Sequence, residues 1–322
     1  MTTANLTVRV QDKRIIAKDI CLLDLTSSNG QPLPAFEAGA HIDVCLREDR
    51  VRQYSLCNPP GQPSTYQIAV LLDPESRGGS KAVHEDVRAG DTLVISAPRN
   101  RFELVAGAPY SLLLAGGIGV TPLLAMAWTL LARGAGFQMH YFVRSAQRAA
   151  FRAVIDASPL ASHVSYWFDD DAATARPAID ELIGRSPVGT HVYVCGPGGF
   201  IDHAIGACER SGLSTEHIHY ERFQAARGAR EVDEQEFTVV IGSTGQQIVV
   251  ARDESVTEAL ARSGVTIPVS CEQGICGTCL TRVRGGIPDH RDQYLTEQER
   301  LAGDCFLPCC SRSLTPELVL DV

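Results

Sequence analysis

Short runs of apolar or alternating residues recur along the first third of the chain, and a turn follows each run. The turns are rich in Gly, Pro and Asn, as at Ser28-Asn29-Gly30. The runs predict strands at Leu6–Val10, Ile15–Leu25, His41–Leu46, Tyr66–Leu72 and Thr92–Ala97. Short strands at this spacing are typical of a small β-barrel, which we expect over residues 1–105.

The pattern changes over residues 106–226, where apolar strand-like runs alternate with amphipathic helical ones. Strands are predicted at Ser111–Ala115, Gln138–Val143, His163–Phe168, His191–Cys195 and His217–Arg222. Helices are predicted at Thr121–Ala132, Ala146–Ala157, Ala178–Ile183 and Phe200–Ser211. Alternation of this kind predicts an α/β domain with a doubly wound parallel sheet.

Residues 227–236 are polar and charged, which predicts a linker to a last domain over residues 237–322. A hairpin is expected there from Glu236–Ile241 and Gln246–Val250, followed by a helix at Ser255–Ser263. Ser255 and Glu258 have the spacing of a capping box at the start of this helix. A cysteine-rich loop comes next, and the whole order is similar to that of a β-grasp ferredoxin domain.

Composition narrows the class of protein. The 322 residues carry a net charge of −9, which argues against a broad nucleic-acid surface. The longest apolar run, Ser111–Leu131, is interrupted by glycines and a proline and does not predict a membrane span. The start of the chain lacks the pattern of a signal peptide, and the cysteine count of 11 is odd, so we expect a reducing cytoplasm.

The strongest chemical signal is a set of four cysteines near the end of the chain. Cys271, Cys276 and Cys279 have the spacing C-x4-C-x2-C, and 29 residues separate the last of them from Cys309. This is the ligand pattern of a plant-type [2Fe–2S] cluster. Structural thiols or a zinc site are the alternatives, and zinc sites favour two short C-x2-C pairs or histidine partners. The pattern therefore predicts an iron–sulfur cluster.

One predicted barrel strand carries a candidate cofactor site at Arg52-Gln53-Tyr54-Ser55-Leu56. Alternation along a strand sends Arg52 and Tyr54 to one side and Ser55 to the other. An arginine beside an aromatic ring suits a flat cofactor that carries a phosphate. A barrel strand with a surface arginine is the alternative.

A second candidate site is the run Arg77-Gly78-Gly79-Ser80-Lys81, which precedes a short helix predicted at residues 82–87. Glycines before a helix leave free amides toward an anion, and we expect Ser80 to be the N-cap. By itself such a run also fits ordinary helix capping. Together with the strand around Tyr54, it predicts a flavin phosphate site.

Two glycine loops follow predicted strands of the α/β domain. The first runs from Gly116 to Pro122 and the second begins at Cys195-Gly196-Pro197. Ligands of open α/β sheets bind at the carboxyl ends of the strands, so both loops are expected at one nucleotide site. Arg144 and Ser145 follow another strand and are expected near the ribose or adenine, with a solvated surface role as the alternative for Arg144. Cys195 is a candidate for the nicotinamide side, or else a small buried apolar residue.

Taken in order, these motifs resemble the phthalate dioxygenase reductase family, the reductase components of Rieske-type oxygenases such as vanillate demethylase. The resemblance covers essentially the whole chain. It implies a barrel that binds FMN, a domain that binds NADH and a C-terminal [2Fe–2S] ferredoxin domain. The cofactor-binding residues it implies are Arg52, Tyr54, Ser55, Ala69, Leu71, Gly78, Gly79, Ser80, Lys81, Gly117, Gly119, Thr121, Arg144, Ser145, Cys195, Gly196, Pro197 and Phe223.

Within this set, the resemblance implies that Thr121 lies close to the flavin and that Phe223 covers the isoalloxazine ring. The fourth cluster ligand is then Cys309, because the family pattern Cys-x-Ser-Arg matches Cys309 to Arg312, although Cys310 is an adjacent alternative. NADH rather than NADPH also rests on the resemblance, since Arg144 and Arg148 are both suited to a 2′-phosphate.

The function implied is electron transfer from NADH through FMN and the cluster to a Rieske-type oxygenase, with catalysis by cofactors and without a general acid or base. The oxygenase would act on an aromatic acid or a similar small molecule, as a monooxygenase, dioxygenase or demethylase. We expect a monomer that meets its acceptor transiently. Two alternatives are a redox-sensing regulatory protein and a stand-alone flavin reductase of a small molecule.

Overall fold

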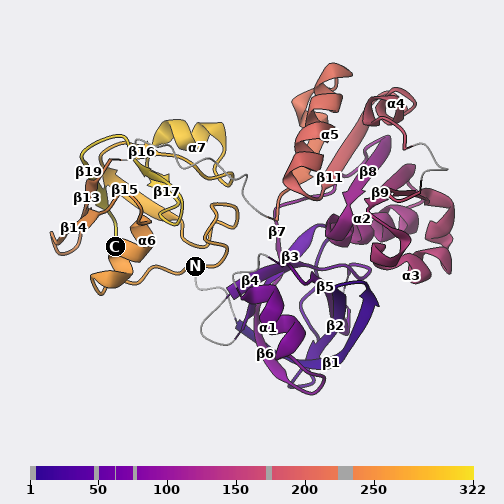
Figure 1. Cartoon of the computed structure of the whole chain (residues 1–322), viewed down its shortest axis with the longest axis horizontal. Coiled ribbons are helices and arrows are strands. Elements are labelled where there is room, and N and C mark those ends of the chain that lie inside the picture. The colour runs from indigo at the N-terminus through magenta and orange to yellow at the C-terminus, as the bar shows by residue number, and fades with distance from the viewer. Residues whose placement is uncertain (1–4, 47–50, 62, 75–77, 172–175, 224–234) are drawn as a thin grey trace. The chain divides into compact units, whose positions relative to one another are not determined.

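The computed structural model describes residues 5–46, 51–61, 63–74, 78–171, 176–223 and 235–322 (Figure 1). It divides into two compact units, Met1–Arg222 and Phe223–Val322. The linker predicted at residues 227–236 lies almost entirely outside the described residues, as does Arg77. The domain boundaries expected from the sequence therefore remain predictions, and each unit is described by itself.

The first unit begins with an antiparallel sheet in the order β4-β3-β6-β1-β2-β5. A bridge between Leu56 and Ile68, just beyond β4 and within β5, joins the two ends of the sheet. Tyr66 and other apolar side chains fill the interior, which confirms the predicted barrel. Its strands are β1 (Asn5–Ala17), β2 (Ile20–Ser27), β3 (Ala40–Cys45), β4 (Val51–Ser55), β5 (Thr65–Leu71), β6 (Thr92–Ser96) and β7 (Arg99–Asn100).

The strand predicted at Ile15–Leu25 is wrong, because a hairpin divides it. Ala17 of β1 pairs with Ile20 of β2, so Lys18 and Asp19 form a two-residue turn. Asp19 has a φ of 63°, a conformation that Asp tolerates better than most residues. The polar pair Lys18-Asp19 interrupts the apolar run, and it marks the turn between the two strands.

The predicted N-cap of the first helix is also wrong. Helix α1 (Gly79–Glu85) begins after Gly78, whose φ of 88° suits glycine. Ser80 lies inside the helix, and its hydroxyl accepts a hydrogen bond from the Asp73 amide at 3.1 Å. A glycine before the helix and a serine within it leave the first amides of α1 without a side-chain cap.

The rest of the first unit is a parallel sheet in the order β10-β9-β8-β11-β12. Helices α4 and α5 lie together on one side of it, against Leu112 and Val192, and α2 packs against β8, β9 and β11 (Figure 1). This confirms the predicted doubly wound fold. The elements are β8 (Tyr110–Gly116), η1 (Gly117–Gly119), α2 (Val120–Ala132), β9 (Phe137–Val143), β10 (Val164–Phe168), η3 (Pro159–His163), α4 (Ile179–Gly184), β11 (Thr190–Cys195), α5 (Gly198–Arg210), η4 (Thr215–His217) and β12 (Ile218–Glu221).

The helix predicted at Ala146–Ala157 is interrupted. A short 3-10 helix, η2 (Ala146–Arg148), precedes α3 (Arg152–Asp156), and Phe151 between them has a φ of 62°. The hydroxyl of buried Tyr141 accepts a hydrogen bond from the Ala150 amide at 3.1 Å. This bond and the burial of Phe151 take the place of continuous helical bonding, so tertiary contacts override the local pattern.

The second unit has a mixed sheet in the order β14-β13-β19-β15-β17, beside a two-stranded ribbon of β16 and β18. Its elements are β13 (Phe237–Ile241), β14 (Gln247–Val250), α6 (Val256–Arg262), β15 (Thr281–Gly285), β16 (Pro288–Asp289), α7 (Glu297–Ala302), β17 (Cys305–Phe306), β18 (Arg312–Ser313) and β19 (Glu317–Leu320). The capping box predicted at the start of α6 is confirmed: the Ser255 hydroxyl accepts from the Glu258 amide at 3.2 Å, and the Glu258 carboxylate accepts from the Ser255 amide at 2.8 Å.

Arg312 ties the ends of the second unit together. Its guanidinium donates to the carbonyl oxygens of Glu254 at 2.8 Å, Ala251 at 3.0 Å and Gln235 at 3.1 Å. The same group stacks on the Phe237 ring, 5.1 Å from its centroid. A buried arginine with this many partners holds the first strand of the unit against the segment that follows the cluster region.

Within the described part of the chain, we find no helix with the length and apolar character needed to cross a membrane.

Lys13 of β1 supports the far end of α1 and provides a test of the barrel. Its ammonium donates to the carbonyl oxygens of Val83 at 2.7 Å, His84 at 2.7 Å and Val87 at 2.8 Å. We expect Lys13→Met to lower the free energy of unfolding of this unit by about 2 kcal/mol, because carbonyls at the helix end lose charged donors. Lys18→Met, at an exposed turn, should change it by less than about 0.5 kcal/mol in the same urea titration. Equal effects would contradict this role.

Candidate functional site

The four predicted ligand cysteines gather in the second unit. Cys271 accepts hydrogen bonds from the thiols of Cys276 and Cys309, which lowers the pKa of Cys271 and raises the pKa of both donors. Cys279 also interacts with Cys309, and this interaction lowers the pKa of Cys279. The long gap in sequence is therefore closed in space, and four sulfurs lie within reach of one another.

The number and spacing of these sulfurs suit a two-iron cluster. Among the described residues, no group of three or more His, Cys, Asp or Glu side chains has the geometry to hold a single metal ion. Cys276 and Cys309 both contact Cys271, and Cys279 contacts Cys309. A [2Fe–2S] cluster takes four thiolates in all, two for each iron, so the residues present fit this group.

Two glycines allow the cysteine loop to close tightly. Gly274 has a φ of 73° and Gly277 a φ of 69°, which few side chains tolerate. A Cβ atom on Gly274 would lie 2.4 Å from the Cys310 sulfur, and one on Gly277 would lie 2.1 Å from Cζ of Tyr294. Any larger residue at either position would push the loop away from the segment that covers it.

The structure places Cys310 beside the thiol group and Cys309 within it. Cys310 touches Gly274 and lies 3.7 Å from both the Leu307 carbonyl oxygen and the Ser311 hydroxyl. Its sulfur contacts Cys309, whereas Cys309 contacts Cys271 and Cys279 as well. This geometry favours Cys309 as the fourth ligand, in agreement with the family pattern.

In the barrel, the structure brings Arg52 and Gly79 together. A Cβ on Gly79 would lie 2.6 Å from Nε of Arg52, so glycine is needed for the arginine side chain to cross the start of α1. Tyr54 is half-buried beside the barrel core, and burial raises the pKa of its hydroxyl, which therefore stays protonated. The strand and the helix predicted to hold a flavin phosphate are thus adjacent.

The other barrel residues predicted to bind FMN lie on β5 and on α1. Ala69 is buried on β5, and Leu71 ends the same strand half-buried. Lys81 is exposed on α1 and lies 4.0 Å from Glu85. The Ser80 hydroxyl accepts from the Asp73 amide, which leaves its O–H group and the Ser80 backbone amide as donors for a phosphate.

The two glycine loops of the α/β sheet meet backbone to backbone. A Cβ on Gly119 would lie 2.2 Å from the carbonyl oxygen of Cys195, and one on Gly196 would lie 2.9 Å from Cα of Gly116. Cys195 is fully buried, and burial raises the pKa of its thiol well above the ordinary value. The loops therefore share one site at the carboxyl ends of β8 and β11, with a neutral thiol beneath them.

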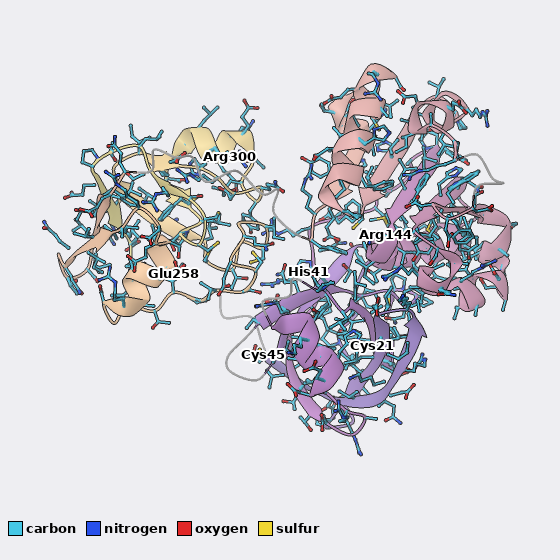
Figure 2. The ribbon with its side chains drawn as sticks, in the orientation of Figure 1. Cys21, His41, Cys45, Arg144, Glu258 and Arg300 are labelled. Carbon is cyan, nitrogen blue, oxygen red and sulfur yellow. The ribbon has the colours of Figure 1, made fainter. Side chains whose placement is uncertain are left out.

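Other predicted nucleotide residues line the same end of the sheet. Thr121 is buried at the start of α2, and its hydroxyl donates to the Ile118 carbonyl oxygen at 3.0 Å. Arg144 is exposed just beyond β9, where Figure 2 labels it, and Ser145 follows it. Pro197 precedes α5. Arg148, the other candidate for a 2′-phosphate, pairs with Asp19 at 3.0 Å.

Phe223 follows Arg222 directly and begins the second unit. Its predicted position over the isoalloxazine ring stays a prediction.

Sequence reasoning missed Glu221, the last residue of β12. It pairs with Cys195 across the two strands, and its Oε2 atom is buried without a hydrogen-bond partner among the described residues. Burial raises the pKa of this carboxyl to about 8, although a hydrogen bond with Ser55 opposes the shift. In the sequence, Glu221 is marked only by its position two residues before Phe223. Its contact with Ser55 joins residues far apart in the chain and could not be read from the sequence.

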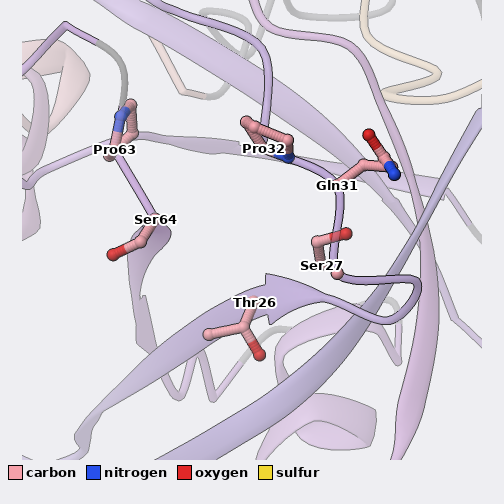
Figure 3. A pocket seen from close by; sticks show the side chains of 7 residues that line it. Thr26, Ser27, Gln31, Pro32, Pro63 and Ser64 are labelled. Atoms are coloured by element: carbon pink, nitrogen blue, oxygen red, sulfur yellow. The ribbon is translucent and has the colours of Figure 1, made fainter.

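A cavity of about 480 Å³ on the barrel is lined by Thr26, Gln31, Pro32, Ser64 and their neighbours (Figure 3). Its lining has no titratable side chain, and Ser64 precedes the start of β5, whereas Ala69 and Leu71 lie toward the other end of that strand. We therefore do not assign cofactor chemistry to it.

Comparison with known proteins agrees with this geometry. The family of 2Fe-2S iron-sulfur cluster binding domains matches residues 239–314. A vanillate O-demethylase oxidoreductase of Pseudomonas sp. (strain HR199 / DSM 7063) is 47% identical over 98% of this chain and 99% of its own length. The 3-chlorobenzoate-3,4-dioxygenase reductase subunit of Comamonas testosteroni is 37% identical over 98% of this chain and 96% of its own.

The solved structure of phthalate dioxygenase reductase, described as modular for electron transfer from pyridine nucleotides to [2Fe-2S], is similar with a TM-score of 0.76. It is 35% identical, and the match covers 99% of this chain and 98% of that one. The likeness thus extends over both units and includes the cysteine loop. The chain belongs to the phthalate dioxygenase reductase family, the oxidoreductases that serve as reductase components of oxygenase systems.

Proposed function

We propose that this protein passes electrons from NADH through FMN and a [2Fe–2S] cluster to a Rieske-type oxygenase. The observation that carries the proposal is the gathering of four cysteine thiols in a protein that matches oxygenase reductases along nearly its whole length. When bound, FMN accepts a hydride and releases electrons singly, and the cluster relays them one at a time. The protein supplies position, exclusion of water and control of protons.

The barrel residues would hold FMN. Arg52, which crosses Gly79, would pair with the phosphate, and the free amides of α1 would donate to the same group. Tyr54 and Ser55 of β4 would contact the ring system, with Ala69 and Leu71 of β5 on the neighbouring strand. Gly78 and Lys81 complete the phosphate side of the site.

The crossed glycine loops would hold NADH. Gly117 and Gly119 of the first loop and Gly196 and Pro197 of the second would contact the pyrophosphate and the nicotinamide. Space within 4 Å of a Cβ on Gly117 is open, whereas Gly119 and Gly196 let the two loops pack against each other. Arg144 and Ser145 would meet the adenosine ribose. Arg148 already pairs with Asp19, which supports a preference for NADH over NADPH, since a 2′-phosphate would have to compete with this carboxylate.

Glu221, which forms a hydrogen bond with Ser55, would bring a protonated carboxyl to this site. A carboxyl with a pKa of about 8 is protonated at neutral pH, and its hydrogen bond with Ser55 reaches the strand proposed to contact the flavin. Full reduction of a flavin to its neutral form takes up a hydride and a proton, and Glu221 would hold a proton close to the strand proposed to contact the flavin. This proposal differs from the expectation that no acid or base takes part, which stays a prediction.

The oxygenase partner would act on an aromatic acid or a comparable small molecule, as the named relatives of this chain suggest. A net charge of −9 favours a transient, salt-sensitive encounter with a basic face of the acceptor. We also propose a monomer. A location in the cytoplasm is supported by the described cysteines, none of which forms a disulfide.

An anaerobic NADH titration of the purified protein tests this function. We expect released FMN, two irons per chain by analogy with the cluster type, and a reduced-cluster EPR signal that appears as NADH is added. Vanillate-type oxygenases supplied as acceptors should then turn over with NADH. A cluster that NADH leaves oxidised would refute the electron path, and reduction without delivery to any oxygenase would favour a sensor or a flavin reductase.

Serine substitutions distinguish the two neighbouring cysteines near the end of the chain. We expect Cys309→Ser to lose most of the iron and to weaken or change the EPR signal, because a serine oxygen replaces a thiolate ligand. Cys310→Ser should keep full iron content and the wild-type spectrum. Iron assay and EPR of both variants, prepared identically, give the answer; the opposite pattern would identify Cys310 as the ligand.

Replacement of Glu221 tests the proton at the nucleotide site. Glu221→Gln removes the acid but keeps a hydrogen-bonding side chain, so we expect flavin reduction by NADH to slow by about 10²-fold. The wild-type rate should fall as the pH rises through about 8, where the carboxyl ionises, and the variant should lack this step. Stopped-flow absorbance measures both, with exposed Glu209→Gln as the control.

The same substitution has a signature in stability. The folded pKa of Glu221 lies above its usual value of 4.5, so its favourable contribution is complete below pH 4.5 and is lost as the pH rises toward about 8. Urea titrations should show the wild type losing stability across this window relative to Glu221→Gln. Parallel pH profiles for the two proteins would mean that the carboxyl is not buried as described.

A further inference from the structure

His290 is a buried imidazole without a hydrogen-bond partner. It follows β16, and its side chain is 10% exposed. Within the described residues, neither Nδ1 nor Nε2 has a partner at hydrogen-bond distance. A buried neutral imidazole ordinarily has at least one hydrogen-bond partner. A second proton would make both ring nitrogens donors and so change the contacts that this ring is able to form.

The nearest charged group is the carboxylate of Asp292, which is fully buried. Oδ1 of Asp292 lies 3.7 Å from Nδ1 of His290, beyond hydrogen-bond distance. Oδ2 accepts from the amides of Tyr294 at 3.0 Å and Leu295 at 2.8 Å. Arg300 of α7, labelled in Figure 2, lies 3.8 Å from the same oxygen. The carboxylate is thus oriented by its own loop, with one oxygen toward the imidazole.

Asp292 also connects this pair to the cysteine loop. A Cβ on Gly274 would lie 2.9 Å from Cα and Cβ of Asp292, so the two backbones are in close contact. The Gln293 amide donates to the Gly274 carbonyl oxygen at 2.9 Å. On the other side, the Ser311 hydroxyl approaches Asp292 at 3.5 Å, two residues beyond Cys309. His290 and Asp292 therefore belong to the segment that covers the cluster site.

The other charged groups of this segment are already paired. Arg291 binds Asp289 at 2.7 Å, and Arg312 is occupied by backbone carbonyls. Arg300 faces Asp292 from α7. The sequence has nine histidines, and His290 is the only one after residue 222. The second unit therefore has a single imidazole.

We propose that His290 takes up a proton when the [2Fe–2S] cluster is reduced, with Asp292 as the positioning residue that links the imidazole to the cluster loop. In this step the electron would come from NADH by way of FMN, as in the proposed function, and one proton from water would bind an imidazole nitrogen. No covalent bond to carbon or sulfur would change. The inference rests on the cluster of the proposed function. It concerns His290, which has no part in that function.

The physical reason is electrostatic. An electron added to a buried cluster increases the negative charge of a region with a low dielectric constant, which favours a positive charge nearby. Protonation gives His290 two donors, so that Nδ1–H is able to close the gap to the Asp292 carboxylate. The proton makes the reduced cluster more favourable at low pH, and cluster reduction makes the protonated imidazole more favourable in return.

An EPR-monitored redox titration of the full-length holoprotein between about pH 6 and pH 9 tests the proposal. The cluster midpoint potential of the wild type should fall as the pH rises. We expect proton binding at least about threefold tighter in the reduced state, which is about 28 mV for one electron. His290→Gln and His290→Asn should both give a potential that does not change with pH, while exposed His203→Gln keeps the wild-type slope.

The outcomes separate this inference from the proposed function. A wild-type potential that is independent of pH overturns the inference even if neither His290 variant assembles a cluster. A slope that persists in His290→Gln or His290→Asn also overturns it. In both cases the EPR signal and its reduction by NADH stay intact, whereas a wild-type protein without a reducible cluster would refute the proposed function instead.

Discussion

The second unit depends on enclosing a negatively charged cluster in a loop short enough to bring three thiolates together and a fourth from far along the chain. Backbone must pass very close to backbone for this, and Gly274 and Gly277 are the positions where a side chain would prevent it. The segment from Asp292 to Leu295 covers the cysteine loop, and Cys309 follows it in the chain as the fourth thiolate. Loss of either glycine would therefore affect the loop, its cover and the fourth ligand together.

In the first unit, backbone also passes close to backbone, at the carboxyl ends of β8 and β11. There the two glycine loops touch through Gly119 and Cys195, which leaves no room for a side chain at Gly119. Glu221 and Ser55 bring a protonated carboxyl to the boundary between the α/β sheet and the barrel. Position and protonation are thus set by packing, while the redox chemistry belongs to the cofactors.

Buried charges hold the supporting elements in place. Lys13 closes the end of the helix proposed to receive the flavin phosphate, and Arg312 joins three backbone carbonyls to the strand that starts the second unit. Asp292 serves the same purpose above the cysteine loop. Each is a charged side chain that satisfies backbone groups at points where no secondary structure does so, which makes its removal costly.

The sequence by itself determined the features encoded in spacing and periodicity: the barrel, the doubly wound sheet, the cysteine pattern and the capping box at Ser255. Only the tertiary structure decided where the helices and strands depart from the local sequence pattern, as at the turn of Asp19 and at Phe151. Contacts with distant residues outweigh local propensity there. It also revealed Glu221 and His290, whose properties come from burial beside residues remote in the chain. Spacing records which residues are neighbours along the chain, whereas burial and partners depend on how the chain folds back on itself.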